Sequence, residues 1–134
     1  AVRGWGNMMA LVSRIDTIFV PALEPVAAAD WYRRLFGLET VFEEADYVAL
    51  RFPGEAPRDR TALTLVKAEA IDRAAHPAFN FFTADPDRLH AEITAAGSEA
   101  TPIEQSGGMS HFSFRDFSGN WVNVCHFQAV ASRP

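Results

Sequence analysis

The chain contains two stretches with the same order of expected elements, and this internal repeat constrains the fold more than any single motif. Residues 14–67 and 77–127 each begin with a β-branched or aromatic run, continue into an amphipathic helix that ends at glycine, and finish with strand signals. The helix-ending glycines, Gly37 and Gly97, lie farther apart than the repeat of about 20–50 residues typical of solenoids. The pattern therefore predicts a duplicated βαβββ module, with function inside a cup formed by two half-sheets.

Length and hydrophobic content indicate one compact domain. A chain of 134 residues with 49% hydrophobic side chains falls in the single-domain range and can fill a core. We expect an α+β domain over 14–127, preceded by a lead-in at 1–13 and followed by a tail at 128–134. The lead-in lacks the apolar run of a signal peptide. It is either a loosely docked segment or an addition before a native start at Met8 or Met9.

Charge and cysteine content narrow the class of partner. The formal net charge is −5 and no basic run occurs, which argues against binding to nucleic acid or to an anionic membrane surface. No apolar stretch approaches the roughly 20 residues that a membrane-spanning helix needs. The single cysteine, Cys125, cannot form an internal disulfide, so a reducing cytoplasm is the expected location.

Both expected helices have recognisable ends. Pro25 suits the first turn of a helix, the alanines that follow are strong helix formers, and Gly37 ends the segment. The second helix opens at residues 85–87, an acidic start with proline in the first turn, and closes at Gly97. We expect each helix to lay one apolar stripe on a sheet.

Two segments resemble a known superfamily. The closing segment FRDFSGNWVNVCHF and the opening segment TIFVPALEPVAAADWYRRLFGLE are similar to the corresponding segments of vicinal-oxygen-chelate proteins. That superfamily includes glyoxalase I, extradiol dioxygenases and bleomycin-resistance proteins, and the resemblance extends over residues 14–127. It implies two βαβββ modules that pair into a cup-shaped mixed sheet with helices on the outer face. It also implies a homodimer.

The resemblance further implies four positions for a divalent metal in the cup, one on the first and one on the last strand of each module. In this sequence they are Thr17, Thr64, Ala78 and Asn123. Alanine has no donor atom, and hydroxyl or carboxamide oxygens are poor substitutes for the imidazole and carboxylate of Mn, Fe, Ni or Zn sites. We therefore expect no metal at these positions, no cofactor and no catalytic residue of the family type.

The closing hairpin determines which side chains share a face. A two-residue turn at Ser118-Gly119 gives a definite register, which a bulge would change. The expected pairs are Phe112 with Cys125 and Phe114 with Asn123 on the cup face, and His111 with His126 on the other. The histidines are then ordinary surface or strand-end residues, and Cys125 behaves as a small hydrophobe.

On this register the cup has aromatic walls and a few polar groups, as ligand pockets do. The faces of the aromatic rings in the cup could stack on a planar ligand or attract a cationic one. The alternative for each phenylalanine is an ordinary place in the core. The expected ligand-binding residues are Thr17, Phe19, Thr64, Ala78, Asn80, Phe82, Phe112, Phe114, Trp121, Asn123 and Cys125.

Three functions remain open. The first is a metal-free protein of the glyoxalase/bleomycin-resistance type that holds an aromatic or amphipathic small molecule in the cup. The second is a lyase, isomerase or dioxygenase-like enzyme, acting either without metal or through a non-standard site such as His76 with Glu69 or His111. The third is an interaction module whose cup is filled by its own side chains. The sequence favours the first because the family metal positions lack metal-binding side chains.

Overall fold

The computed structural model describes residues 11–54 and 60–128. The expected lead-in at 1–13 and tail at 128–134 lie mostly outside these ranges, so the domain boundaries stay a prediction. No helix among the described residues is long and apolar enough to cross a membrane.

Each module folds as one helix and four strands. The first module consists of β1 (Thr17–Ala22), α1 (Pro25–Phe36), β2 (Glu39–Glu44), β3 (Tyr47–Arg51) and β4 (Ala62–Lys67). The second consists of β5 (Asn80–Phe82), α2 (Pro86–Ala95), β6 (Glu104–Ser106), β7 (Met109–Arg115) and β8 (Trp121–Phe127). The strand orders are β1-β4-β3-β2 and β5-β8-β7-β6, so both modules have the same topology. The predicted duplicated βαβββ fold is confirmed.

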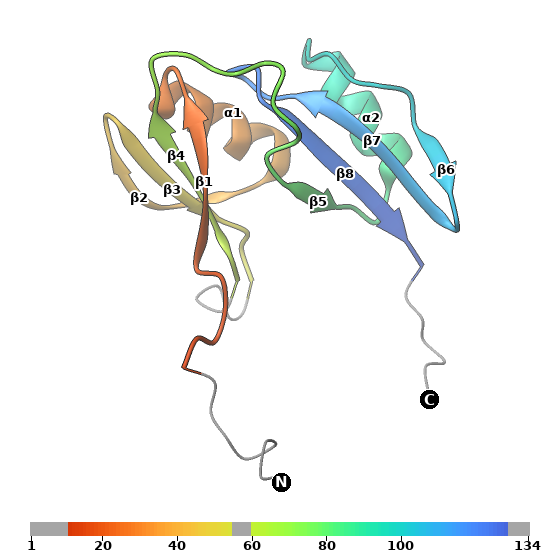
Figure 1. Ribbon diagram of the computed structural model, residues 1–134, viewed down its shortest axis with the longest axis horizontal. Coiled ribbons are helices and arrows are strands. Elements are labelled where there is room, and N and C mark those ends of the chain that lie inside the picture. Colours follow the sequence, from red (N-terminus) through yellow and green to blue (C-terminus); the bar gives the residue numbers. More distant parts are fainter. Residues whose placement is uncertain (1–10, 55–59, 129–134) are drawn as a thin grey trace, which may run out of the picture.

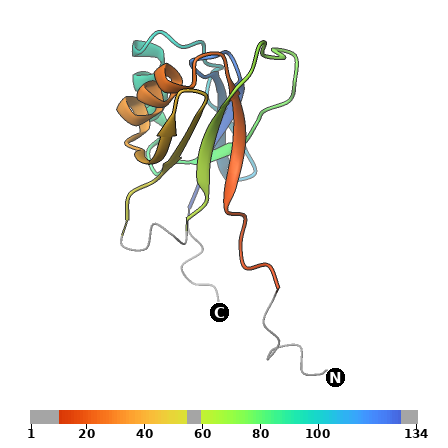
Figure 2. The same cartoon turned by 90° about the vertical axis from the view of Figure 1, so that its left-hand side faces the viewer.

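The two sheets lie side by side, with β1 and β5 toward the centre of the molecule (Figure 1). In each sheet the first strand pairs in parallel with the last, and the remaining pairs are antiparallel. Figure 2 shows both helices on one side of the sheets. The core lies between the helices and this side, and it includes Val20, Tyr32, Leu50, Leu65, Ile93, Phe114, Val122 and Val124. The opposite side of the sheets is left without a helical cover.

The helix ends form as their sequences predict. Gly37, at φ 75°, adopts the left-handed conformation that ends α1, and its N–H donates to the carbonyl of Arg33 over 2.9 Å. At the start of α2, the Asp85 carboxylate accepts from the Arg88 N–H over 3.2 Å. Because this contact satisfies one of the free amides of the first turn, it fixes where α2 begins.

The predicted two-residue turn between β7 and β8 is wrong. The Asp116 N–H donates to the Asn120 carbonyl over 2.8 Å, which leaves three residues in the loop, and Gly119 has φ 105°. The Asp116 carboxylate accepts from the N–H groups of Ser118, Gly119 and Asn120 over 3.0, 2.9 and 2.9 Å. This carboxylate stabilises the three-residue loop. Compared with the predicted two-residue turn, the longer loop shifts every pair of opposed residues on β7 and β8 by one residue.

The shift moves two predicted cup residues into the core. Phe112 pairs with Val124 and Phe114 with Val122, on the side of the sheet that the helices cover. Phe114 is 0% exposed and contacts Trp31 and Phe36 of α1. The prediction that Phe112 and Phe114 lie on the cup face is therefore wrong, because a one-residue change of register exchanges the two faces of a strand.

Candidate functional site

The side of the sheets opposite the helices is the candidate site, and we call it the open face. Strand alternation assigns its residues, because core residues such as Val48, Leu65 and Val124 point to the helices and their neighbours point away. The open face includes Thr17, Phe19, Phe42, Tyr47, Thr64, Asn80, Phe82, Met109, His111, Ser113, Trp121, Asn123, Cys125 and Phe127.

Several large aromatic side chains of the open face are exposed. Phe19 is 63% exposed and Phe82 is 56% exposed, although both lie within strands. Phe42 contacts Tyr47 with ring centroids 6.0 Å apart, and Phe82 contacts Phe127 at 5.0 Å. Each sheet thus presents an aromatic pair to solvent. Clustered apolar side chains of this kind mark interaction surfaces more often than isolated ones do.

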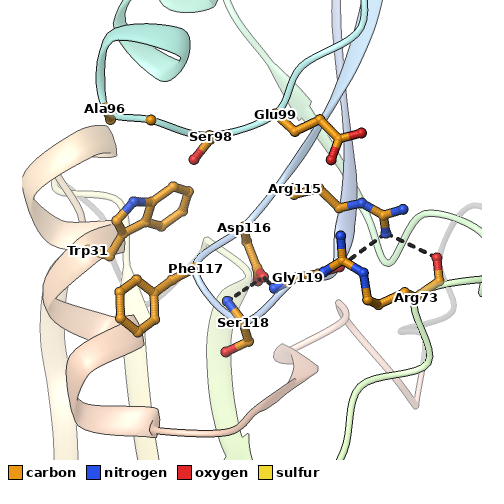
Figure 3. Close-up of a pocket in the computed structure, with 11 residues that line it drawn as sticks. Trp31, Arg73, Ala96, Ser98, Glu99, Arg115, Asp116, Phe117, Ser118 and Gly119 are labelled. Carbon is orange, nitrogen blue, oxygen red and sulfur yellow. Dashed lines mark hydrogen bonds between the residues drawn. The ribbon is translucent and has the colours of Figure 1, made fainter.

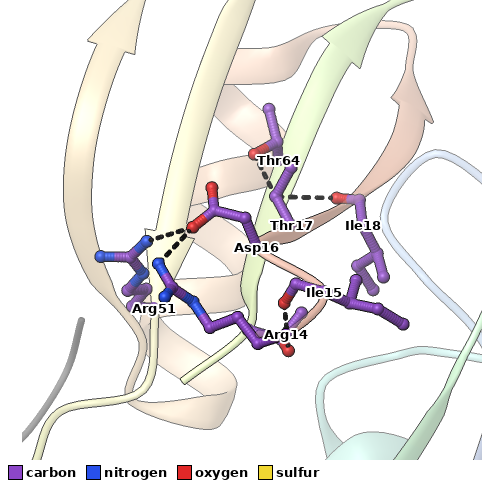
Figure 4. Close-up of polar contacts among 8 residues, drawn as sticks. Arg14, Ile15, Asp16, Thr17, Ile18, Arg51 and Thr64 are labelled. Carbon is purple, nitrogen blue, oxygen red and sulfur yellow. Dashed lines mark hydrogen bonds and ion pairs between the residues drawn. The ribbon is translucent and has the colours of Figure 1, made fainter. Parts of the chain in front are cut away.

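On the first module, the two positions expected for family metal ligands come together. The Oγ1 atoms of Thr17 and Thr64 lie 2.6 Å apart and share a hydrogen bond, as Figure 4 shows. Thr64 is only 1% exposed, so its hydroxyl has this bond in place of water. The two hydroxyls satisfy each other and offer no anionic or imidazole donor.

On the second module, the remaining two positions have one weak metal-binding side chain, Asn123, and one side chain with no donor atom, Ala78. The Ser113 hydroxyl donates to the Asn123 side-chain oxygen over 2.5 Å. Ala78 precedes β5 and contributes only a methyl group, while its N–H donates to the Trp121 carbonyl over 2.9 Å. Within the described residues, no three His, Cys, Asp or Glu side chains gather to hold a metal ion. The four positions do not fit the metal that the family fold implies.

A cavity of about 610 Å³ lies where the modules meet. Its lining residues are Phe36, Gly37, Phe52, Pro53, Arg60, Asn80, Phe81 and Phe82. Aromatic walls with one guanidinium and one carboxamide suit a ligand that has an apolar body and a polar or anionic substituent. Asn80 and Phe82 were among the predicted ligand-binding residues. Phe52 and Arg60 were not, because they come from the ends of a loop that gave no periodic signal.

A sequence model of the Glyoxalase/Bleomycin resistance protein/Dioxygenase superfamily matches residues 14–124. The chain belongs to this superfamily. No curated protein sequence matches the chain. The resemblance expected from the opening and closing segments is thereby confirmed.

Solved structures of superfamily folds agree with this assignment. TnmS3, an antibiotic binding protein from Streptomyces sp. CB03234, superposes with a TM-score of 0.71 at 17% identity, over 90% of this chain and 100% of that one. Lactoylglutathione lyase from Agrobacterium tumefaciens superposes with a TM-score of 0.66 at 22% identity, over 87% of this chain and 96% of that one. The bleomycin resistance determinant encoded on transposon Tn5 superposes with a TM-score of 0.64 at 18% identity, over 87% of this chain and 100% of that one. At these identities the likeness is one of fold.

This superfamily member has a second cleft, of about 350 Å³, beside the β7–β8 turn. Figure 3 shows Trp31 and Phe117 on one side of the cleft and Arg73 and Arg115 on the other. Arg115 donates to the carbonyls of Arg73 and Gly119 over 3.0 and 3.1 Å. Because these contacts bind Arg115 to the main chain around the turn, we interpret the cleft as part of the scaffold.

The turn also joins the two modules. The Tyr32 hydroxyl of α1 donates to the Asp116 carboxylate over 2.8 Å, and the Asn120 carboxamide donates to the Pro21 carbonyl over 2.8 Å. Burial raises the pKa of Tyr32 well above its usual value of 10.0, and the charge of Asp116 and the hydrogen bond to it raise the pKa further. Tyr32 therefore stays a neutral donor to the buried carboxylate.

The structure separates the predicted ligand-binding residues into groups. Thr17, Phe19, Thr64, Asn80, Phe82, Trp121, Asn123 and Cys125 lie on the open face, Ala78 lies just before β5, and Phe112 and Phe114 lie in the core. Trp121 is half-buried, and the Arg115 guanidinium lies over its ring at 3.8 Å from the centroid. Only the other ring face of Trp121 is left for a ligand.

Proposed function

We propose that this protein binds a small aromatic or amphipathic molecule on the open face and at the cavity between the modules, without a metal at the family positions. The observation that supports this most strongly is the exposure of Phe19 and Phe82 within regular strands. Exposing such side chains costs free energy, at about 25 cal/mol per Å² of apolar surface, so a surface that keeps them suits a partner that covers them.

The polar groups near these rings fit the same kind of ligand. Asn80 and Arg60 line the cavity of about 610 Å³ beside Phe52 and Phe82. They could orient a carboxylate, phenol or amide while the rings stack on an apolar body. We choose the test compounds by the similarity of the fold to an antibiotic binding protein and to a bleomycin resistance determinant.

We also propose that two copies associate through this face, in the cytoplasm. The aromatic pair Phe42 and Tyr47 lies on β2 and β3, at the end of the first sheet's strand order opposite to β1, and a second copy could cover it. Sedimentation equilibrium of the protein and of Phe42→Ala tests this. A monomer at micromolar concentration would contradict the dimer and leave the ligand proposal unaffected.

The binding test uses thermal stabilisation by a panel of aromatic antibiotics, followed by calorimetric titration of any compound that stabilises the protein. Phe82→Ala and Phe19→Ala should weaken binding by about 10-fold or more, which corresponds to loss of about 1.4 kcal/mol of ring contact. Phe117→Ala is the matched control, because Phe117 is 50% exposed but lies at the β7–β8 turn. Equal affinity in all three variants would place the ligand elsewhere.

A further inference from the structure

The corrected register brings three sulfur and nitrogen donors together on the open face of the second sheet. Met109 and His111 are two residues apart on β7 and so point to the same side. Cys125 on β8 pairs directly with His111. Directly opposed residues of antiparallel strands have Cβ atoms roughly 4.5–5.5 Å apart, so the imidazole and the thiol are neighbours.

The side chains of Met109, His111 and Cys125 border one cavity. A cavity of about 260 Å³ is lined by Asn80, Met109, His111, Asn123, Val124 and Cys125. Cys125 is only 9% exposed, yet it borders this cavity. The Asn80 carboxamide donates to the Cys125 sulfur over 3.4 Å.

The imidazole of His111 is free to act as a ligand. Among the described residues, the rings of His76, His90 and His126 each have a main-chain carbonyl within hydrogen-bond distance, at 3.0, 2.9 and 2.8 Å. In the same part of the chain, the His111 ring has no such partner and borders the cavity. A half-buried imidazole without a protein partner, beside a thiol and a thioether, is available to a ligand from solution.

We propose that Met109, His111 and Cys125 form a binding site for a soft monovalent cation, Cu(I), with Asn80 supporting the cysteine sulfur. Thiolate and thioether sulfur select Cu(I) over hard divalent ions, and imidazole binds copper well. On binding, the Cys125 thiol loses its proton to solvent and an S–Cu bond replaces the S–H bond, with no change in oxidation state. The site uses different side chains from the four family metal positions and goes beyond the proposed ligand binding.

The test is an anaerobic titration of the reduced full chain against the Cu(I) chelator bicinchoninate. One equivalent of Cu(I) should move from the chelator to the protein, with a new ultraviolet absorption from thiolate-to-copper charge transfer. Cys125→Ser, His111→Gln and Met109→Leu should each weaken Cu(I) binding by at least about 10-fold, a loss that even outer-shell changes cause at metal sites. Thermal unfolding without copper checks that the variants are folded.

Matched controls isolate the site. His76→Gln removes an exposed imidazole, and the double change Met8→Leu and Met9→Leu removes two thioethers, so both variants should bind Cu(I) like the unmodified chain. No transfer from the chelator, or equal affinity in Cys125→Ser and His111→Gln, would overturn the proposal. Zn²⁺ binding as tight as that of Cu(I) at this site would overturn the assignment to a soft cation. None of these results depends on the aromatic-ligand test, which uses Phe19 and Phe82.

Discussion

The hydroxyl oxygens of Thr17 and Thr64 lie 2.6 Å apart, where the family resemblance places the first module's two metal ligands. One residue comes from β1 and the other from the parallel strand β4, so the fold brings the two positions together whatever side chains they have. In this chain the two hydroxyl groups share a hydrogen bond. The family scaffold is retained here without the family's metal-binding side chains.

This pair can be tested by a double-mutant cycle. Thr64→Val alone should lower the free energy of unfolding by about 1 kcal/mol, because it removes the shorter of the two hydrogen bonds of the Thr17 hydroxyl. Adding Thr17→Val should cost little more, since the two methyl groups then face each other and no polar group is left unpaired. Urea denaturation of the four proteins measures the coupling. Strictly additive losses would show that the two hydroxyls act independently.

Removal of the Cys125 sulfur should leave no tight site for divalent metals. We expect Cys125→Ser, prepared without a polyhistidine tag, to contain no stoichiometric metal and to show no saturable binding of Ni, Zn, Fe or Mn. The physical reason is that Thr17, Thr64, Ala78 and Asn123 offer neither imidazole nor carboxylate. Metal analysis and calorimetric titration measure this. One tightly bound divalent ion would contradict it and favour the enzyme interpretation.

Tyr32 should give the fold a specific alkaline sensitivity. Its pKa in the folded protein is raised, first by burial and then by Asp116, whereas the pKa in the unfolded chain is about 10. The unfolded chain therefore loses this proton first. The contribution of the protonated Tyr32 phenol to the free energy of unfolding is complete below about pH 10. It disappears as the pH rises toward the pKa that Tyr32 has in the folded protein.

The variant Tyr32→Phe measures this effect. At neutral pH it should be less stable by about 1.5–3 kcal/mol, the usual contribution of a hydrogen bond to a charged group. Denaturant unfolding from about pH 8 to 11 should show this difference shrinking above about pH 10, because only the unmodified chain has the phenol to ionise. A difference that stays constant over this range would mean that Tyr32 does not titrate with unfolding.

Within the β7–β8 turn, substitution of Asp116 should lower the stability of the fold the most. Asp116→Asn places an amide where three main-chain N–H groups and the Tyr32 hydroxyl now donate, so stability should fall by about 2–3 kcal/mol. Asp30→Asn is the control, because Asp30 forms only an exposed ion pair with Arg34, and it should cost less than about 0.5 kcal/mol. Similar losses in both variants, measured by urea denaturation, would contradict the role of Asp116.

Local signals made the helices and the order of helices and strands along the chain predictable. Pro25, Gly37 and Asp85 determine helix ends through contacts within one turn, and such contacts can be inferred from sequence. The β7–β8 turn could not be, because Asp-Phe-Ser-Gly-Asn suits both a two-residue and a three-residue loop. The choice depends on the Asp116 carboxylate, whose other partner, Tyr32, is distant in sequence. That one undetermined turn exchanged the core and open faces of β7.

The exchange of faces gives opposite expectations for two aromatic residues that the sequence placed in one pocket. Phe114→Ala should destabilise the fold by about 3–5 kcal/mol, because Phe114 is fully buried between the sheet and α1. Trp121→Ala should cost less stability, because Trp121 is half-buried on the open face, and it should weaken ligand binding instead. Thermal unfolding and ligand titration of both variants measure the two effects. A stable Phe114→Ala with lost ligand binding would restore Phe114 to the binding face and contradict the three-residue turn.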